Sequence, residues 1–478
     1  MSIRGTEIVF RLSPLLIMAP ASIFADQFLQ QGHNVVSDVT WWYVTDTMQA
    51  LGPAFVKLCQ WAATRRDIFP PVMCDRLQEL QSRGNPHSWA GTHAALQEAF
   101  GADYAEHGLI VNSKTKILGC GSAAQVYEGS LVSTDKETGA TERRPVAIKV
   151  LHPKFEVMVE RDLWFMDSVA QMLHSLPVEH IKMLNLPRAS TNFGSILRRQ
   201  ADLRIEAENL QQFRANFYRD EKDEETSAIL FPRPVEGWIS HNVLVKELFG
   251  NGRSIAEFIN DGSTEGHAVR KELAGPLLRA FLKMVFLDNF VHCDLHAGNV
   301  LVLESTVPHK PSLASWWGGK TDAEASLQVE ETKRTIVFLD AGIAVSLDPE
   351  DRKNLRDLFR AVIMNKGDEA GRLMVERAKY ERCSQVEGGV DAFAKGIDEL
   401  VGEFHDRRKE GLTLGAVRIG SLLSRVLELC RVHGVEIDPS MASIVISTLV
   451  LEGLGRSLEP RLNLMDFAVP FVLGRGRV

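Results

Sequence analysis

The stretch VHCDLHAGNVLV, residues 291–302, decides the fold when it is taken together with VFLDAG, residues 337–342, further along the chain. Each is a short apolar run beside a turn that carries ionisable groups, and this is how an α/β fold delivers side chains to a cleft. Asp294 and Asn299 stand five positions apart, and Asp340 ends the second apolar run. A carboxylate that accepts a proton, followed by an amide and a carboxylate that can hold a divalent cation, is the set that phosphoryl transfer needs.

Two other interpretations of this stretch are open. His292, Asp294 and His296 alternate, so on an extended strand they would share a face and could ligate the metal of a metallo-hydrolase. No further His and Asp cluster in the sequence completes such a site. The stretch could also be a buried strand between polar turns. The segments upstream of it are needed to choose between these interpretations.

Composition narrows the class of protein. A chain of 478 residues is expected to form two or three sub-domains. The formal net charge of −8 argues against a nucleic-acid partner, which would require a basic face. The six cysteines are scattered without a C-x-x-C pair, so the sequence predicts neither a disulfide framework nor a zinc module, and a reduced compartment is the default.

The N-terminal part is predicted to be helical. Residues 1–37 are an apolar segment whose run from Ile8 to Phe24 is interrupted by charge and proline, too short for a confident membrane span. It is expected to pack, contact a membrane or serve in targeting. Residues 38–110 form a helical extension: apolar residues recur at helical spacing over 38–66, a further helical run covers 72–81, and a polar helix covers 94–100.

A small-residue loop follows, between Ile117 and Tyr127. In the kinase pattern G-x-G-x-x-G-x-V its third glycine is replaced by Ala124. Glycines let backbone N–H groups approach phosphate oxygens, although any tight hairpin would look alike. The residues expected to contact a nucleotide here are Gly119, Gly121, Ser122, Ala123, Ala124 and Val126.

The strand VAIKV, residues 146–150, places Lys149 where it would contact the α and β phosphates. Helices are predicted over 155–175 and 193–218. In the second, Glu206 is predicted to pair with Lys149, and Gln200, Asp202 and Glu206 are candidates for an edge that faces the cleft. The competing interpretation is a solvated acidic helix.

The remaining segments complete a two-lobed pattern. A strand from Asn242 runs into a hinge, where backbone groups near Glu247 and Phe249 would meet adenine. A polar insertion, 304–335, separates the two halves of the deciding stretch, and helices are predicted from 351 to 458. The apolar run 441–451 is too short for a bilayer and is expected in the core, before an apolar and basic tail, 461–478.

These features occur in the order found in kinases. The predicted fold is therefore α+β, protein-kinase-like and two-lobed, with an N-lobe over 111–250 that contains inserted helices and a helical C-lobe over 251–460. Two standard features are missing, since no A-P-E follows Asp340 and Ala341 replaces the phenylalanine of D-F-G. Helix from Glu350 leaves little room for a peptide-docking segment, so a conventional protein kinase is not expected.

The sequence resembles the UbiB-type, aarF-domain-containing atypical kinases linked to coenzyme Q biosynthesis, over residues 40–460. The resemblance rests on KLCQ at 57–60 (the family's K-x-G-Q), QAD at 200–202 (its E/Q-x-D) and HCDLHAGN at 292–299. The stretch WAATR at 61–65 and the long insertion look like the mitochondrial subgroup described as aarF-domain kinase two.

The resemblance implies Mg²⁺-dependent binding of ATP and an ATPase or a small-molecule or lipid kinase activity. It implies a peripheral location on the matrix face of the mitochondrial inner membrane, a lipid or quinone-like ligand, and coenzyme Q biosynthetic proteins as partners. In the family the K-x-G-Q helix folds over the active site, so Lys57 and Gln60 would face Gln200 and Asp202. Cys59 replaces the family's glycine, which leaves open how closely that helix approaches the nucleotide.

The hypothesis for the mechanism assigns one role to each residue. Lys149, oriented by Glu206, neutralises phosphate charge; Asp340 and Asn299 hold Mg²⁺; and Asp294 orients the attacking water or hydroxyl. One alternative is a small-molecule phosphotransferase of the aminoglycoside or choline kinase type, which shares H-x-D-L-H-x-x-N but would not need the Lys57 helix. The other is a pseudokinase scaffold that binds lipid without turnover.

Overall fold

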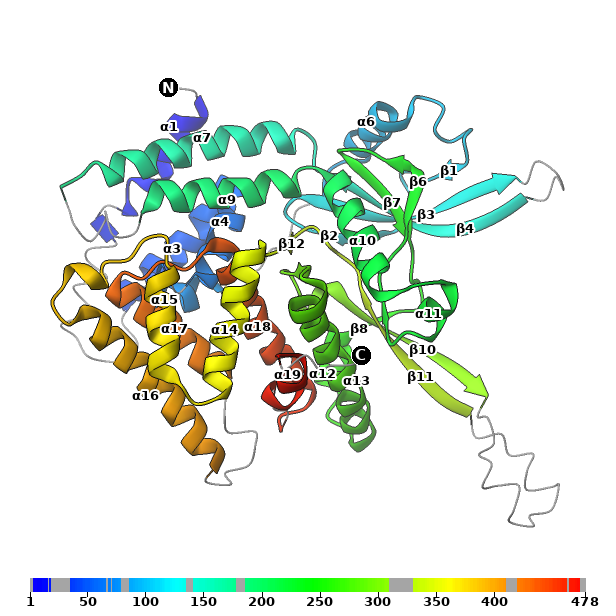
Figure 1. Cartoon of the computed structure of the whole chain (residues 1–478). Coiled ribbons are helices and arrows are strands. Elements are labelled where there is room, and N and C mark those ends of the chain that lie inside the picture. Colours follow the sequence, from blue (N-terminus) through cyan, green and yellow to red (C-terminus); the bar gives the residue numbers. More distant parts are fainter. Residues whose placement is uncertain are drawn as a thin grey trace, which may run out of the picture.

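A computed structural model of the 478-residue chain describes the residues given next. They are 3–15, 17–18, 35–65, 68–69, 71–78, 86–134, 141–177, 185–308, 330–409, 419–461 and 464–472. Two lobes are visible in Figure 1, a sheet-containing N-lobe and a helical C-lobe, with further helices at the N-terminal end. The predicted two-lobed α+β fold is confirmed.

The N-lobe contains an antiparallel sheet in the order β1-β3-β4-β7-β6, with β2 paired to β3. The strands are β1 (Leu109–Ile110), β2 (Ile117–Cys120), β3 (Ala124–Thr134), β4 (Thr141–Leu151), β6 (Pro234–Ile239) and β7 (Val243–Glu247). Alternate residues of β4 and β7, such as Ile148 and Val245, are buried in a cluster with α6 (Trp89–Phe100). The residues between them therefore point to the opposite face of the sheet.

The other helices of this half of the protein belong to the N-terminal extension or to the segment between β4 and β5. They are α1 (Ile3–Leu12), α3 (Val35–Leu51), α4 (Pro53–Thr64), α5 (Pro71–Gln78), α7 (Phe155–His174), α9 (Leu186–Gln200), α10 (Leu203–Phe217) and α11 (Glu221–Thr226). Helix α4 packs on α5, α7 and α9, and Arg4 of α1 is paired with the buried Asp162 of α7. The part of the apolar N-terminal segment that is described thus packs on the protein, while 19–34 lies outside the described residues.

The segments 291–302 and 337–342 lie on strands and on the loops between them. Strands β5 (Ile229–Leu230), β8 (Arg253–Ser254), β10 (Val300–Pro308) and β11 (Glu330–Phe338) form one sheet, and β9 (Val291–His292) pairs with β12 (Ala344–Val345). Strands β10 and β11 form the long hairpin at the lower right of Figure 1. The predicted polar insertion, 304–335, is therefore too wide: 304–308 and 330–335 are paired strand, and 309–329 lies outside the described residues.

The C-lobe is helical. Its elements are α12 (Ile255–Asn260), α13 (Thr264–Leu282), the π-helical turn η1 (Lys283–Asp288), the 3₁₀ turns η2 (Ala297–Asn299) and η4 (Cys383–Gln385), α14 (Pro349–Ile363), α15 (Gly367–Arg377), α16 (Gly389–Lys409), α17 (Ile419–His433), α18 (Pro439–Leu458) and α19 (Leu464–Val472). One continuous apolar cluster runs from Ala54 of α4 to Phe471 of α19. The apolar part of the tail is therefore packed in the core.

Helix α18 is the one described helix that is long and apolar enough to cross a membrane by length and composition, and half of its most apolar window is buried in the protein. Ile444 and Leu451 belong to the main core cluster. The prediction that the apolar run 441–451 belongs to the core is confirmed.

The predicted helix over 193–218 is wrong in one respect, because the helix is interrupted at residues 201–202, between α9 and α10. The side chain of Asp202 accepts a hydrogen bond from the backbone N–H of Arg204 and caps α10. An aspartate in this role satisfies N–H groups that have no partner within the helix, and therefore favours a new helix start over continuation. Consequently Glu206 lies in the first turn of α10.

Candidate active site

Strand alternation and register place two lysines on the cleft face of the N-lobe sheet. Lys149 of β4 pairs with Leu244, and Lys246 of β7 pairs with Ala147, two positions from Lys149. Because side chains on one face of a sheet repeat every second residue, both ammonium groups lie on the face opposite Ile148 and Val245. This face of the sheet therefore carries two positive charges from adjacent strands.

One carboxylate, that of Glu206, joins the two lysines. Its Oε2 accepts from Nζ of Lys149 at 2.6 Å and its Oε1 accepts from Nζ of Lys246 at 2.7 Å. The Glu206 side chain is only 3% exposed. The predicted pairing of Lys149 with Glu206 is present in the structure, so the solvated-helix interpretation is wrong for this residue.

Lys149 also reaches the C-lobe, where its Nζ lies 2.6 Å from Oδ2 of Asp340. Burial alone would lower the pKa of Lys149, but the charges of Asp340 and Glu206 outweigh burial and raise it. Burial alone would raise the pKa of Asp340, but Lys149, Lys246 and the Gly342 N–H hold it well below its ordinary value. The site therefore contains an ammonium and a carboxylate that both stay charged at neutral pH.

Two loops from the deciding stretch face each other. The pair Val300–Phe338 ends the β10–β11 ladder, and the pair His292–Ala344 begins the β9–β12 ladder. Residues 293–299 and 339–343 are the segments between these ladders. The backbone bonds from Leu339 N to Asn299 O (2.9 Å) and from Cys293 N to Ile343 O (3.0 Å) tie the segments together. Asp294, Asn299 and Asp340 are thus carried by two adjacent loops, as their spacing predicts.

His292 is fully buried, and both of its ring nitrogens are engaged. Its Nε2 bonds to the carbonyl oxygen of Asp340, and its Nδ1 accepts from the backbone N–H of Asp294 at 3.1 Å. Since a carbonyl can only accept, the ring is the neutral tautomer with hydrogen on Nε2. Burial lowers the pKa of His292. The metallo-hydrolase interpretation fails here, and the described residues contain no group of three or more His, Cys, Asp or Glu that could hold a metal ion.

Asp340 and Asn299 fit a hard cation such as Mg²⁺. The Asn299 amide donates its Nδ2 hydrogen to the Asp294 carbonyl at 3.2 Å, which turns Oδ1 away from that contact. This Oδ1 has no hydrogen-bond partner in the described part of the chain, and Asp340 supplies an ionised carboxylate. Carboxylate and amide oxygens are the protein ligands that Mg²⁺ prefers.

The small-residue loop is open to a ligand. Gly121 N donates to Ala124 O at 2.9 Å and closes the turn between β2 and β3. Within the described residues, the backbone N–H groups of Ser122 and Ala123 have no partner, so both can donate to an anion. A Cβ on Gly119 would meet no heavy atom within 4 Å, so packing does not explain that glycine.

The other predicted nucleotide contacts differ in placement. Val126 lies directly opposite Lys149 in the β3–β4 register, whereas Ala124 is buried at 6% exposure and contributes to the core. At the hinge, Glu247 N donates to Arg233 O and Phe249 O accepts from Gly252 N. These two backbone groups are therefore already engaged, and an adenine contact would use the other groups of this segment.

The Lys57 helix is near the site but is not bonded to it. Helix α4 packs on α9 through Trp61 and Phe193, whose rings lie 5.6 Å apart. The Asp202 carboxylate is taken by Arg204, with a shortest distance of 2.7 Å. Among the residues that the structure describes, no hydrogen bond joins Lys57 or Gln60 to Gln200 or Asp202.

Cys59, which stands in place of the family's glycine, lies on the buried face of α4. It packs in a cluster with Ala62 and Leu77. Burial raises the pKa of its thiol to about 12. The thiol is therefore neutral and serves packing.

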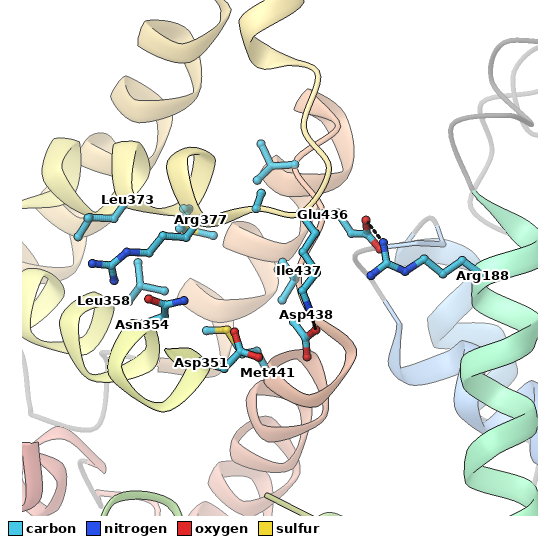
Figure 2. Close-up of a pocket in the computed structure, with 14 residues that line it drawn as sticks. Arg188, Asp351, Asn354, Leu358, Leu373, Arg377, Glu436, Ile437, Asp438 and Met441 are labelled. Carbon is cyan, nitrogen blue, oxygen red and sulfur yellow. Dashed lines mark hydrogen bonds and ion pairs between the residues drawn. The ribbon is translucent and has the colours of Figure 1, made fainter. Parts of the chain in front are cut away.

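Helix α9 is fixed to the C-lobe at its other end. Figure 2 shows Arg188 reaching from α9 to Glu436 beside a cavity of about 60 Å³, and the ion pair measures 2.6 Å. The guanidinium of Arg188 also lies 5.0 Å from the ring centre of Tyr380. One helix therefore joins the Arg188 anchor to Gln200, the first residue of the QAD stretch.

Sequence reasoning missed two buried residues of the site. Lys246 donates to Glu206 and also to the carbonyl of Leu339 at 2.7 Å. Asn209 of α10 donates to the carbonyl of Ala341 at 2.7 Å. A lysine inside the apolar strand VLVKE was a usable signal, because a charge is rarely buried without a partner. Asn209 gave no comparable signal.

The fold and this set of contacts define a kinase-like protein. A scan of protein families matches residues 79–373 to the ABC1 atypical kinase-like domain and residues 408–463 to the UbiB helical domain. The chain belongs to the ABC1/UbiB family of atypical kinase-like proteins.

Curated relatives extend over nearly the whole chain. "ABC1 family protein C21C3.03, mitochondrial" of Schizosaccharomyces pombe is 30% identical, covering 98% of this chain and 70% of that protein. "ABC1 family protein YPL109C, mitochondrial" of Saccharomyces cerevisiae is 32% identical, covering 98% and 74%. The solved structure of the Rv3197–erythromycin complex from Mycobacterium tuberculosis aligns over 94% of this chain and 93% of that chain, with a TM-score of 0.46 and 17% identity.

Proposed function

We propose that this protein is an atypical kinase or ATPase that binds Mg²⁺ and ATP in the cleft between its lobes and transfers the terminal phosphoryl group to water or to a small-molecule or lipid acceptor. The observation that carries the proposal is the contact of Lys149 with both Glu206 and Asp340, at 2.6 Å each. It joins the two lobes through a cation that is suited to phosphate and a carboxylate that is suited to metal.

The chain's own residues have separate tasks in this mechanism. The free N–H groups of Ser122 and Ala123 donate hydrogen bonds to phosphate oxygens, and Lys149 neutralises the charge of these oxygens. Asp340 and Asn299 would hold Mg²⁺, which neutralises charge on the phosphates when it is bound. Asp294, whose backbone is fixed by His292, orients the attacking hydroxyl and accepts its proton.

The Asp294 assignment predicts a separation of binding from turnover. Asp294→Asn is expected to bind Mg·ATP as the wild type does, because Asp294 is not among the proposed metal or phosphate ligands. The rate of ADP formation should fall about 100-fold or more, the usual contribution of a positioned proton acceptor. Equilibrium binding of Mg·ATP and ADP formation, measured on the same preparation, check this. Full turnover in Asp294→Asn would remove Asp294 as the proton acceptor.

A scaffold without turnover is the second candidate, and one contact favours it. Lys149 occupies Oδ2 of Asp340, and the Gly342 N–H donates to Oδ1 at 2.8 Å, so metal must compete for both oxygens. If wild-type protein forms no ADP from Mg·ATP, with or without small-molecule or lipid acceptors, the scaffold is correct.

A phosphotransferase of the aminoglycoside or choline kinase type makes a different demand on α4. It would not need the Lys57 helix, whereas a UbiB-type enzyme would. The substitutions Lys57→Ala and Gln60→Ala should alter nucleotide turnover in the proposed enzyme, although neither side chain has a hydrogen bond among the described residues. Unchanged turnover in both variants would mean that the Lys57 helix takes no part in nucleotide turnover, as in a phosphotransferase of the choline kinase type.

We propose a mitochondrial location, on the matrix face of the inner membrane, with a role in coenzyme Q or lipid metabolism. The mitochondrial names of the two yeast relatives support the compartment. A quinone-like or lipid ligand, peripheral membrane contact and coenzyme Q biosynthetic partners follow from the family resemblance. Protease protection in isolated mitochondria, with and without rupture of the inner membrane, tests the location.

A further inference from the structure

A chain of five hydrogen bonds connects the region of α6 to the small-residue loop, and the proposed mechanism does not use it. It links Gln125 Nε2 to Tyr127 Oη (2.8 Å), Tyr127 Oη to Thr92 Oγ1 (2.6 Å), Thr92 Oγ1 to His87 Nε2 (2.8 Å), His87 Nδ1 to His152 Nδ1 (2.7 Å) and His152 Nε2 to Gly121 O (2.9 Å). The end of this series of hydrogen bonds that lies away from the loop has no access to solvent, since Thr92, Gln125 and Tyr127 are all buried.

The donor and the acceptor of every hydrogen bond in the series follow from its last member, the Gly121 carbonyl. The Gly121 carbonyl can only accept, so His152 carries hydrogen on Nε2. In a neutral ring Nδ1 is then an acceptor, and His87 must donate from its own Nδ1. His87 Nε2 accepts from Thr92, Thr92 accepts from Tyr127, and Tyr127 accepts from Gln125. Two neutral rings of opposite tautomer satisfy every atom of the chain.

His152 holds the loop at two points. Its backbone N–H donates to Ala123 O at 2.9 Å, while its ring donates to Gly121 O. These bonds draw the carbonyls on both sides of Ser122 toward β4. The N–H groups of Ser122 and Ala123, which have no partner among the described residues, remain available to a ligand.

We propose that His152 is a positioning residue for phosphate binding, and that the relay through His87, Thr92 and Tyr127 keeps it in the neutral, Nε2-protonated form that holds the loop. This inference rests on the proposed function, because it concerns the same nucleotide loop. It adds a condition to that function, since the loop is held in its binding form only while both histidines are uncharged.

An extra proton cannot enter the relay without the loss of a bond. If both rings kept their hydrogens and His152 gained one, two N–H groups would face each other across 2.7 Å. If the whole chain reversed, the Tyr127 hydroxyl hydrogen would lose its acceptor among the described residues in a buried place. Either outcome disfavours the charged form.

The surroundings offer no compensating charge. The titratable groups against the pair are Tyr127, through Thr92, and Cys120, whose thiol lies 3.8 Å from Gly121 O. No carboxylate among the described residues hydrogen-bonds to either ring. Burial, followed by the repulsion that would arise between the two rings if both were protonated, lowers the pKa of His87 to about 4. A histidine with a lowered pKa supports the ordered form fully above its ordinary pKa, and that support declines as pH falls from about 6.5 toward 4.

The test compares three variants by equilibrium binding of Mg·ATP. In His152→Leu the loop loses its donor, and affinity at pH 7.5 is expected to fall about tenfold. In His152→Gln the amide Nε2 can replace the ring donor, so affinity at pH 7.5 should remain close to wild type. His93→Gln is the matched control, because His93 is a half-buried histidine of α6 that bonds to Tyr104 and not to the loop.

The pH profile separates positioning from simple structural support. Between pH 7.5 and 5.5, wild-type affinity should fall by up to about tenfold more than that of the double variant His87→Gln, His152→Gln, in which neither of the two relay positions can gain a proton. His93→Gln should follow the wild-type profile. Parallel pH profiles of wild type and the double variant, or equal losses of affinity in His152→Gln and His152→Leu at pH 7.5, would overturn the proposal.

A measurement without nucleotide distinguishes failure of this inference from failure of the proposed function. Nitrogen-15 NMR of histidine-labelled protein at pH 7.5 should show hydrogen on Nδ1 of His87 and on Nε2 of His152, assigned with the single variants. If wild type does not bind Mg·ATP at pH 7.5, the proposed function fails whatever the tautomers are. If it binds but the tautomers are reversed or the rings are charged, the relay is wrong and the nucleotide site stands.

Discussion

Replacement of Asp340 by asparagine is expected to abolish the thermal stabilisation that Mg·ATP gives to this protein. Nucleotide at about 100 times its dissociation constant stabilises the binding-competent state by roughly 2.7 kcal/mol, which should raise the wild-type melting temperature by a few degrees. Asp340 supplies the one carboxylate that the proposed Mg²⁺ site contains, and it also contacts Lys149 at 2.6 Å. Asp340→Asn removes the charge from both contacts.

The decisive comparison is a melting curve of each protein with Mg·ATP, with ATP and EDTA, and without nucleotide. The wild-type shift should require Mg²⁺, and the variant should show no shift under any of these conditions. Asp294→Asn is the matched control, because it removes a carboxylate from the facing loop and should keep the shift. If Asp340→Asn keeps the full Mg²⁺-dependent shift, the metal is held elsewhere.

The second large effect is expected in the apoprotein. Glu206→Ala would leave the ammonium groups of Lys149 and Lys246 without the carboxylate that joins them, in positions where their side chains are only 13% and 6% exposed. Removal of one partner from a buried charge cluster typically costs roughly 3–5 kcal/mol. Lys149 keeps Asp340, whereas Lys246 keeps only the Leu339 carbonyl, so most of the loss should arise at Lys246.

Helix α10 offers a matched control for this experiment. Glu208→Ala removes a carboxylate two residues away on the exposed side of the same helix, and surface substitutions of this kind usually change stability by about 0.5 kcal/mol or less. Melting temperatures and urea midpoints of both variants without nucleotide give the comparison. Equal, small effects of the two substitutions would mean that Glu206 is not the structural centre of the cleft.

The sequence predicted the part of the site that depends on local spacing. Lys149, Asp294, Asn299 and Asp340 stand in short strand-and-turn segments whose order is enough to assign them. The pairing of Lys149 with Glu206 also followed from that order. The strands and loops that carry these residues lie where the sequence analysis expected them, and the catalytic role of each residue stays a prediction.

What the sequence could not predict are contacts set by register between distant strands. Lys246 reaches Glu206 because β7 pairs with β4 in the register that puts it opposite Ala147. His87 meets His152 because α6 packs on that sheet, and no periodicity along the chain marks the meeting. The sequence alone could not show that Asp202 caps a new helix. An acidic residue within a helical run is compatible both with continuation of the helix and with a new helix start.

The two loops that carry Asp294 and Asp340 are closed by strand pairs at both ends, β10 with β11 and β9 with β12. Short segments with both ends fixed have little conformational freedom left to lose. Most of the entropy cost of arranging the groups proposed to bind metal and accept the proton is therefore met when the chain folds, and a ligand need not meet it again. Sequence changes in either small ladder, far from any ligand atom, should consequently weaken binding mainly through entropy, with the contacts in the bound complex unchanged.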